Sequence, residues 1–269
     1  MRIGIIGGGF MGEAFLRGVL RAGVATSDEV TVAEVFAERR DALAEHGVHV
    51  TDDSAVAAGE ADLILLAVKP QDFPTMAAAL AGKIPTQAVV VSIAAGIALT
   101  DIARHTGHGA CVRVMPNLPV TIGAGAATYY VAAPVTPAQR THVIAVLDAV
   151  AITAIEVFDD ERVDLSTAVH GSGPAYAYIV MEAMIDSAVR LGMPQADATA
   201  LVLATLSGAA RYAIESGTSP AELREAVTST GGTTEAALAR LEAAGLRTMF
   251  DDAIAAAFVR AKELAEDGS

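Results

Sequence analysis

The chain opens with an apolar run that leads directly into a glycine-rich turn, Ile3-Gly4-Ile5-Ile6-Gly7-Gly8-Gly9-Phe10-Met11-Gly12. The turn fits the pattern G-x-G-x-x-G, and residues 10–22 after it have the apolar periodicity of a helix. In a strand–turn–helix, Gly7 allows the tight turn, Gly9 lets the backbone approach a pyrophosphate, and Gly12 lets the helix pack closely on the strand. A glycine-rich corner without a ligand is the alternative, and the position between strand and helix favours dinucleotide binding.

Downstream of this turn, β-rich apolar runs alternate with helical patterns. The predicted strands are residues 2–6, 30–35, 48–50, 62–68, 89–93, 111–115, 126–131 and 152–157. Helical patterns cover residues 37–45 and 137–150, the second with Thr136 as N-cap. Strands that are apolar on both faces and separated by helices indicate a parallel sheet covered on both sides. The predicted fold class is therefore α/β, with a Rossmann-type doubly wound sheet.

The strand pattern ends after Phe158, and helical patterns follow. Helices are predicted at residues 174–191, 195–215, from Ser219 with a capping box, from the loop at 228–232 to near 245, and on to about 265. Residues 198–210 are apolar or small on every helical face, so this helix needs cover on all sides, which we expect a second subunit to provide. The expected domains are 1–158 for dinucleotide binding and 159–269 for dimerisation and substrate binding.

Charge and composition exclude several classes of partner. The 269 residues include 18 Lys and Arg against 32 Asp and Glu, a net charge of −14. Sequence-independent nucleic-acid binding and docking on anionic membranes both need a basic surface, so neither is expected. The apolar runs are too short to span a bilayer and no targeting segment is visible. The single cysteine, Cys111, excludes an intrachain disulfide and fits the reducing cytoplasm.

Metal and nucleophile signatures are weak. His46 and His49 are three residues apart, as are His105 and His108, but neither pair has a third ligand at metal spacing. No metal site is therefore expected. Nucleophilic hydrolysis has no support, because the sequence has neither a G-x-S-x-G elbow nor a Cys–His signature.

Glu34 is the candidate residue for binding the adenosine ribose of the cofactor. It follows Gly12 by 22 residues, at the end of the second predicted strand. A carboxylate there can accept hydrogen bonds from a 2′-hydroxyl and repels a 2′-phosphate. Arg39 and Arg40 lie close enough to turn towards a phosphate, and a solvated strand end is the alternative for Glu34.

A second group of unusual residues lies in the loop at 227–235, just before a predicted helix. Its hydroxyls and glycines can present backbone N–H groups to an anion, and a small carboxylate would fit. The alternative is a simple loop in which Thr233 caps the helix. Upstream, Gly171-Ser172-Gly173-Pro174 is likewise a tight turn into a helix.

Over nearly its whole length the sequence resembles the pyrroline-5-carboxylate reductase family. The motifs that carry the resemblance are Ile6–Gly12, Ala67-Val68-Lys69-Pro70, Ala94-Ala95-Gly96, Met115-Pro116-Asn117, Gly171-Ser172-Gly173-Pro174-Ala175-Tyr176 and Ser229–Thr234. The last two are the specific ones. Val35 stands where many members have an Arg that faces a 2′-phosphate, and Ser54 where an Asn often helps. His170 replaces a Ser and Thr230 a Pro.

The resemblance implies an enzyme that reduces 1-pyrroline-5-carboxylate to L-proline with NADPH or NADH, the last step of proline biosynthesis. It also implies a homodimer, which in some members assembles into decamers. By resemblance the cofactor contacts are Ile6, Gly7, Gly8, Gly9, Phe10, Met11, Gly12, Glu34, Ser54, Ala67, Val68, Lys69, Pro70, Ala94, Ala95, Gly96 and Asn117. The substrate loop comprises Ser229, Gly231, Gly232, Thr233 and Thr234, and the hydroxyl of Thr234 lies next to the ring nitrogen.

Two other functions remain open from the sequence. One is another Rossmann imine or hydroxy-acid reductase, although most hydroxy-acid enzymes have a catalytic Lys in a long interdomain helix and residues 174–191 contain none. The other is a non-catalytic dinucleotide sensor, which would leave the loop at 229–234 without a role.

Overall fold

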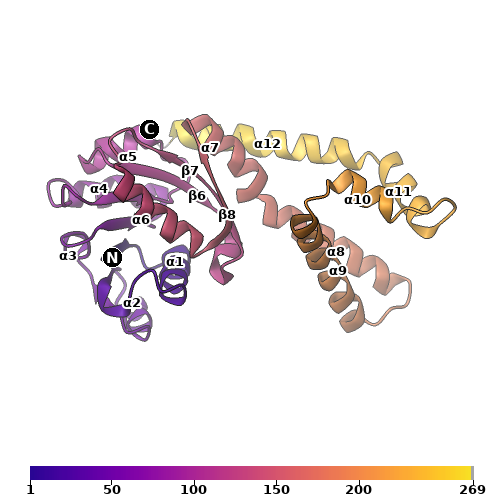
Figure 1. The fold of residues 1–269 in the computed structure, drawn as a ribbon, viewed down its shortest axis with the longest axis horizontal. Coiled ribbons are helices and arrows are strands. Elements are labelled where there is room, and N and C mark those ends of the chain that lie inside the picture. The colour runs from indigo at the N-terminus through magenta and orange to yellow at the C-terminus, as the bar shows by residue number, and fades with distance from the viewer. Residues whose placement is uncertain (268–269) are drawn as a thin grey trace. The chain divides into compact units, whose positions relative to one another are not determined.

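The structure, a computed structural model, describes residues 1–267 (Figure 1). Contacts divide the chain into two units, one of Met1–Ser172 with the described residues from Ala256 onward, the other of Gly173–Ala255. The sequence places a boundary after residue 158. The division by contacts lies later because residues 160–171 pack against the sheet, and the last helix returns to the first unit.

A single sheet organises the first unit. Its strands are β1 (Ile3–Ile6), β2 (Val30–Ala33), β3 (His49–Thr51), β4 (Leu63–Leu66), β5 (Val89–Ser92), β6 (Cys111–Pro116), β7 (Gly125–Val131) and β8 (Ala151–Val157). Within the described chain their order is β3-β2-β1-β4-β5-β6-β7-β8. All eight predicted strands are confirmed, with ends within two residues of those expected.

The predicted parallel sheet has one antiparallel pairing. Strands β1 to β6 are parallel, but β7 runs antiparallel to β6 and is parallel to β8. Only the short turn Leu118–Ile122 and its flanking residues connect β6 to β7. A connection that short cannot cross over to a parallel neighbour, so the chain reverses.

Helices cover both faces of the sheet. They are α1 (Phe10–Arg21), α2 (Ala37–Ala44), α3 (Ser54–Ala58), α4 (Phe73–Leu80), α5 (Leu99–Thr106), α6 (Pro137–Asp148) and α7 (Asp160–Ser166). Strand β4 shows the double cover: Leu63 and Leu65 join the core under α1 and α6, whereas Ile64 and Leu66 join the core under α4 and α5. The sheet is therefore doubly wound, as the apolar strands predict.

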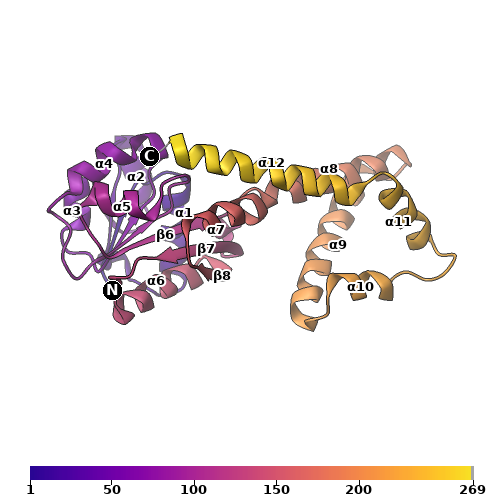
Figure 2. The ribbon, with the colours of Figure 1, turned by 90° about the horizontal axis from the view of Figure 1, so that it is seen from above.

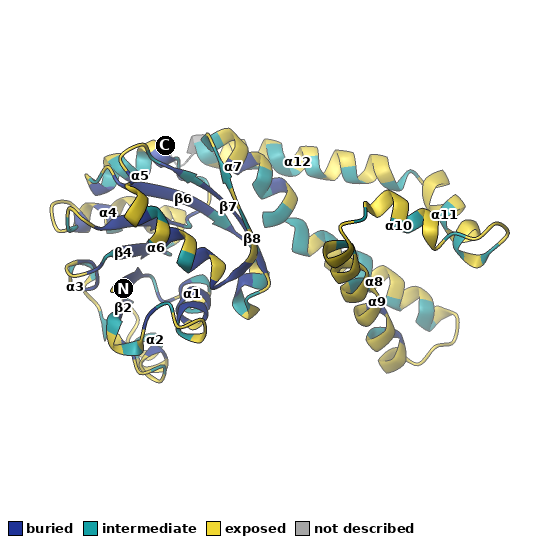
Figure 3. Ribbon diagram, viewed as in Figure 1, coloured by how far each residue is buried: buried dark blue, intermediate teal, exposed yellow. Residues whose placement is uncertain are grey.

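The second unit is helical throughout the residues described. It contains α8 (Gly173–Arg190), α9 (Gln195–Ser216), α10 (Pro220–Ala226), α11 (Thr233–Ala243) and the first part of α12 (Leu246–Asp267) (Figure 2). Among residues 173–255 only Ala198 and Val202 are buried, while Leu203 is 45% exposed and Ile214 69% exposed (Figure 3). This unit alone has almost no core, which fits the expectation that a second subunit covers α9.

None of the helices that the structure describes is both long enough and apolar enough to cross a membrane.

Candidate functional site

Three predicted cofactor segments come together at one edge of the sheet. In register, Ile6 of β1 lies beside Leu66 of β4, and Leu66 lies beside Ser92 of β5. The segments that follow are Gly7–Gly12, Ala67–Pro70 and Ala94–Gly96. The strand order reverses between β1 and β4, and doubly wound sheets bind ligands in the crevice at such a point.

The glycine turn has the geometry that the sequence predicts. Gly7 has a φ of +99°, and a Cβ there would lie 2.7 Å from the carbonyl oxygen of Ala67. A Cβ on Gly12 would lie 1.9 Å from the carbonyl oxygen of Gly7, so the helix packs as closely as only glycine allows. Gly9 is the N-cap of α1 and has nothing within 4 Å of its Cβ position. Its predicted contact with a pyrophosphate is thus sterically open.

Glu34 lies directly beside this turn, at the carboxyl end of β2. Its Oε2 accepts the Gly8 amide proton at 2.9 Å, and its Oε1 accepts the Phe36 amide proton at 3.0 Å. The two arginines are held by backbone carbonyls: Arg39 Nε donates to Gly8 at 2.7 Å, and Arg40 Nη1 donates to Glu34 at 2.7 Å and to Val35 at 2.9 Å. A 2′-phosphate at this corner would therefore meet a fixed carboxylate first.

Arg39 also binds the first turn of α1. Its Nη2 donates to a carboxylate oxygen of Glu13, and this hydrogen bond holds the pKa of Glu13 below its usual range. The corner that links α1, β2 and α2 is thus fixed by charge as well as by backbone hydrogen bonds.

The remaining predicted cofactor residues lie at strand ends or helix starts of the same unit. Ser54 is the first residue of α3, and Lys69 precedes the short turn Pro70–Asp72. Gly96 has a φ of +74°, and a Cβ there would lie 2.9 Å from the carbonyl oxygen of Leu264 in the last turn of α12. The loop after β5 is therefore covered by the C-terminal helix, which sequence patterns do not reveal.

Asn117, at the end of β6, uses its side chain to hold the backbone. Its Oδ1 accepts the Ala126 amide proton at 2.9 Å, and its Nδ2 donates to the carbonyl oxygen of His170 at 3.1 Å. His170 lies in the π-helical turn η4 (Thr167–Gly171). A polar contact of Asn117 with a cofactor would therefore use its backbone, its second Nδ2 proton or the second lone pair of Oδ1.

A buried cluster of one arginine and two aspartates lies near the same edge, and no sequence pattern predicted it. Arg113 of β6 is 3% exposed and donates to Asp160 at 2.7 Å and to Asp164 at 2.5 Å. The Oδ1 atom of Asp160 also accepts the Leu99 amide proton at 3.0 Å, which ties the start of α5 to α7. Burial raises the pKa of Asp164 even though Arg113 lowers it. The acidic start of α7 was visible in the sequence, but its partner lies 47 residues away.

In the second unit, the predicted substrate loop precedes α11. Gly231 has a φ of +73°, and its amide donates to Oε2 of Glu235 at 2.6 Å. The alternative in which Thr233 caps the helix is wrong: Gly232 is the N-cap, with no side-chain cap, and Thr233 and Thr234 are the first two helical residues. Both threonine side chains are thus free of a capping role, because the chain enters the helix one residue earlier.

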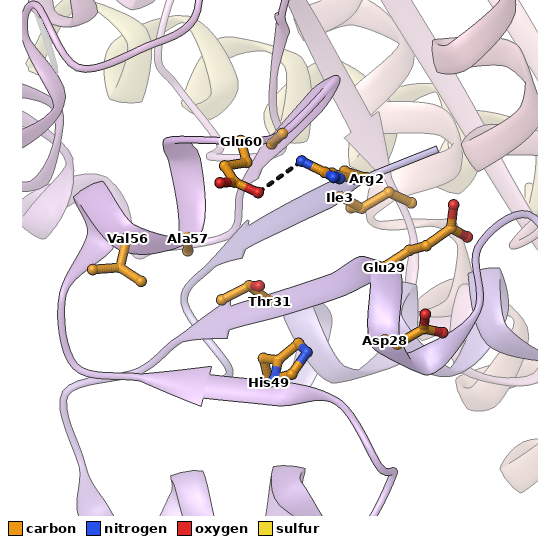
Figure 4. Close-up of a pocket in the computed structure, with 10 residues that line it drawn as sticks. Arg2, Ile3, Asp28, Glu29, Thr31, His49, Val56, Ala57 and Glu60 are labelled. Carbon is orange, nitrogen blue, oxygen red and sulfur yellow. Dashed lines mark hydrogen bonds and ion pairs between the residues drawn. The ribbon is translucent and has the colours of Figure 1, made fainter.

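The opposite edge of the sheet holds a separate hollow of about 370 Å³ (Figure 4). It lies at the amino ends of β1 and β2 and is lined by Arg2, Ile3, Asp28, Glu29, Thr31, His49, Val56, Ala57, Glu60 and Ala61. Arg2 and Glu60 form an ion pair at 2.7 Å on its rim. No predicted site residue lies there, and no cluster of residues in the described chain could hold a metal ion.

Comparisons with known proteins agree with this geometry. The family model for pyrroline-5-carboxylate reductase dimerisation matches residues 160–264, and a model for coenzyme F420-dependent NADP oxidoreductases matches residues 2–96. The pyrroline-5-carboxylate reductase of Pseudomonas aeruginosa is 39% identical, and that of Methanosarcina acetivorans 37%; each alignment covers 98% of this chain and 97% of the relative.

Solved structures agree as well. A pyrroline-5-carboxylate reductase from Coxiella burnetii is 34% identical with a TM-score of 0.90, and 98% of each chain is covered. The Plasmodium falciparum pyrroline carboxylate reductase with NADP bound has the same fold, with a TM-score of 0.88 at 24% identity over 98% of each chain.

Proposed function

This chain belongs to the pyrroline-5-carboxylate reductase family, and we propose that its strand-edge segments hold NAD(P)H while the loop before α11 holds the substrate. It is an NAD(P)-dependent oxidoreductase of proline biosynthesis that reduces 1-pyrroline-5-carboxylate to L-proline. The observation that carries the assignment of the cofactor site is the glycine turn beside Glu34 at the point where the strand order reverses.

The cofactor supplies the hydride when it is bound, and the chain supplies its orientation. In this proposal the pyrophosphate lies against the open position at Gly9 and the first N–H groups of α1. The Glu34 carboxylate accepts a hydrogen bond from the adenosine ribose, and Ser54 lies nearby in the chain order as the first residue of α3. Ala67–Pro70, Ala94–Gly96 and Asn117 line the edge beyond β1, where the carboxyl ends of β4, β5 and β6 lie.

The substrate loop is proposed to hold the carboxylate of the imino acid through backbone amides. The Gly231 amide donates to a carboxylate oxygen of Glu235 at 2.6 Å, so in this proposal the substrate carboxylate takes the place of Glu235 at this amide. Ser229, Gly232 and Thr233 provide the other groups of the loop. The Thr234 hydroxyl is proposed as the hydrogen-bond partner of the ring nitrogen.

Reduction of the C=N bond adds hydride to carbon and a proton to nitrogen. A protonated imine accepts hydride more readily than a neutral one. Residues 229–234 contain no acidic side chain, and Glu235 follows them in the first turn of α11. We therefore propose that the proton arrives with the substrate or from water, and that Thr234 orients the nitrogen.

The matched dimerisation model supports a homo-oligomer. We propose a homodimer in which each subunit covers the apolar residues of α9 in the other, and such dimers can assemble further into a decamer. We also propose a cytoplasmic location, where reduced nicotinamide cofactor is available. Light scattering coupled to size exclusion distinguishes a dimer of about 55 kDa from a decamer of about 270 kDa, given the chain mass of 27.4 kDa.

A steady-state assay of purified protein with 1-pyrroline-5-carboxylate and each cofactor tests the function. Expression should also restore growth without proline to a strain that lacks its own reductase. Cofactor binding without turnover would favour the dinucleotide sensor, and turnover only with other cyclic imines or hydroxy acids would favour another reductase.

A further inference from the structure

His170 makes two contacts that one neutral imidazole cannot satisfy. Its Nδ1 lies 2.6 Å from the carbonyl oxygen of Ser166, and its Nε2 lies 2.8 Å from the carbonyl oxygen of Met115. Carbonyl oxygens only accept hydrogen bonds, so both ring nitrogens must donate. A neutral imidazole carries one N–H, and its other nitrogen would point a lone pair at a carbonyl lone pair. The geometry thus fits the doubly protonated ring.

These two bonds join segments that the cofactor edge depends on. Met115 lies in β6, two residues before Asn117, and Ser166 ends α7. Asn117 in turn donates to the carbonyl oxygen of His170 at 3.1 Å, so each residue's side chain holds the other's segment. A Cβ on Gly171 would lie 3.0 Å from Cε of Met115, which shows how closely η4 and β6 pack.

The charged groups around η4 come from the elements packed against it. On β6 the charged residue is Arg113, which is bound to Asp160 and Asp164 of α7. Also on α7, Glu161 pairs with Lys262 of α12 at 2.6 Å.

Arg162 of α7 lines the groove that also contains His170, and it is paired with Asp159. On β7 the titratable groups are Tyr129 and Tyr130, and burial raises the pKa of Tyr129. No carboxylate among the residues that line this groove competes with the two carbonyl oxygens for the ring protons.

We propose that His170 is a positioning residue that holds the Met115–Asn117 segment in place through both ring N–H groups, so that loss of one proton loosens this segment and weakens cofactor binding. The inference rests on the proposed cofactor role of Asn117, but the protonation of His170 can be measured without any turnover. The ring does not touch substrate in this proposal and acts only through Met115, Ser166 and Asn117.

The first test follows the ring of His170 directly in the full-length protein. Long-range 1H–15N correlation spectra of uniformly labelled protein distinguish a doubly protonated imidazole from either neutral tautomer. The His170 signal is identified by its loss in His170→Gln. We expect the spectrum in which both ring nitrogens carry a proton, because both face carbonyl oxygens. A single neutral tautomer from pH 6 upward would overturn the proposal.

The second test uses variants that keep one donor and do not titrate. A glutamine amide reaches the position of Nε2 and can donate to Met115, whereas an asparagine amide reaches that of Nδ1 and can donate to Ser166. For wild type, His170→Gln and His170→Asn, the KM for NAD(P)H and kcat are measured from pH 6 to pH 9. The matched control is His49→Gln, an exposed histidine at the other edge of the sheet.

The substrate's own imine titrates identically in wild type and in every variant. The ratio of the cofactor KM of a variant to that of wild type therefore reports only the effect of His170. We expect the advantage of wild type over His170→Asn in cofactor KM to fall by about 5-fold as the pH rises, the effect of one lost hydrogen bond, with kcat little changed. A ratio that does not depend on pH, or a change in kcat alone, would overturn the positioning role. Absence of turnover in wild type would count against the proposed function, and the spectra would still decide the state of His170.

Discussion

Glu34 accepts the amide proton of Gly8 at 2.9 Å, so the carboxylate at the end of β2 is fixed against the glycine turn that follows β1. A second bond, from the Phe36 amide at 3.0 Å, holds its other oxygen. With both oxygens held, the negative charge cannot easily turn away from a ligand at this corner. We expect the preference between the two nicotinamide cofactors to follow from this arrangement.

Glu34 should make NADH at least as good a cofactor as NADPH, because a fixed carboxylate repels a 2′-phosphate. Steady-state kcat/KM with each cofactor checks this. A preference for NADPH on the order of 100-fold, about 2.7 kcal/mol, would contradict the prediction and direct attention to Arg39 and Arg40. In Glu34→Gln we expect relative use of NADPH to rise about 10-fold. Glu38→Gln, on the exposed first turn of α2, should leave the ratio unchanged.

Substitutions at Gly9 and Gly12 should have different effects, the first on cofactor binding and the second on stability. The Cβ of Gly12→Ala would lie 1.9 Å from the carbonyl oxygen of Gly7, so this variant should lose about 1–3 kcal/mol of unfolding free energy. Gly9→Ala adds a methyl group with nothing within 4 Å, so its stability should stay within about 0.5 kcal/mol of wild type. Its cofactor Kd should nevertheless rise at least about 10-fold. Urea unfolding and cofactor fluorescence titration measure the two effects, and an unchanged Kd in Gly9→Ala would remove Gly9 from the pyrophosphate site.

Leu203→Asp should prevent assembly of the helical unit. Leu203 is 45% exposed on α9 in the single chain, and residues 198–210 offer no polar face to water. We expect aggregated or unfolded protein by size exclusion and circular dichroism. Ile144→Asp is the control, since Ile144 on α6 is 44% exposed in the first unit. Recovery of a folded, active monomer of Leu203→Asp would refute the obligate interface.

Thr234→Ala should reduce turnover more than stability. Thr234 is the second residue of α11 and does not cap it, so loss of its hydroxyl costs the helix little. Loss of one hydrogen bond to the ring nitrogen should cost about 1–3 kcal/mol in kcat/KM, or roughly 5- to 150-fold. Cofactor Kd should not change. Thr141→Ala on α6, whose hydroxyl donates to the carbonyl oxygen of Pro137 at 3.1 Å, serves as control. Wild-type kcat/KM in Thr234→Ala would exclude Thr234 from the site, and a large fall in Tm would make its role structural.

Cys111 should resist thiol reagents in the folded protein. It is completely buried in β6, and burial raises the pKa of its thiol to about 12. At pH 8 the thiolate fraction is then on the order of 10⁻⁴, and the reagent has no access. Reaction with a chromogenic disulfide should become fast only after unfolding in guanidinium. Fast stoichiometric reaction of the native protein would show that β6 opens.

The features that the sequence predicts are those set by residues close together in the chain. The roles of Gly7 and Gly12 in the turn follow from their spacing, and the continuous apolar run at 63–66 indicates a strand buried on both faces. The direction of β7 was within reach of the sequence, because the predicted strands at 111–115 and 126–131 are separated by about ten residues, too few for a crossover to a parallel neighbour. The N-cap of α11 was not, because a difference of one residue decides whether Thr233 caps the helix.

Contacts between distant segments were also outside the reach of the sequence. In the sequence Arg113 is a single charged residue in an apolar strand. Its partners Asp160 and Asp164 become its neighbours only in the folded chain. Likewise, no periodicity shows that Leu264 packs over Gly96. Each of these pairs depends on how whole elements pack, which a single sequence does not specify.

The return of α12 to the first unit has a consequence for the order of biosynthesis. Residues 173–255 leave the ribosome before the segment from Ala256 that completes the first unit. At about 5–20 residues per second, this interval lasts roughly 10 s. During that time the loop at Gly96 lacks the cover of Leu264. A nascent chain thus carries its glycine turn early, but the loop after β5 is covered only once Leu264 has been made, which is after synthesis of residues 173–255.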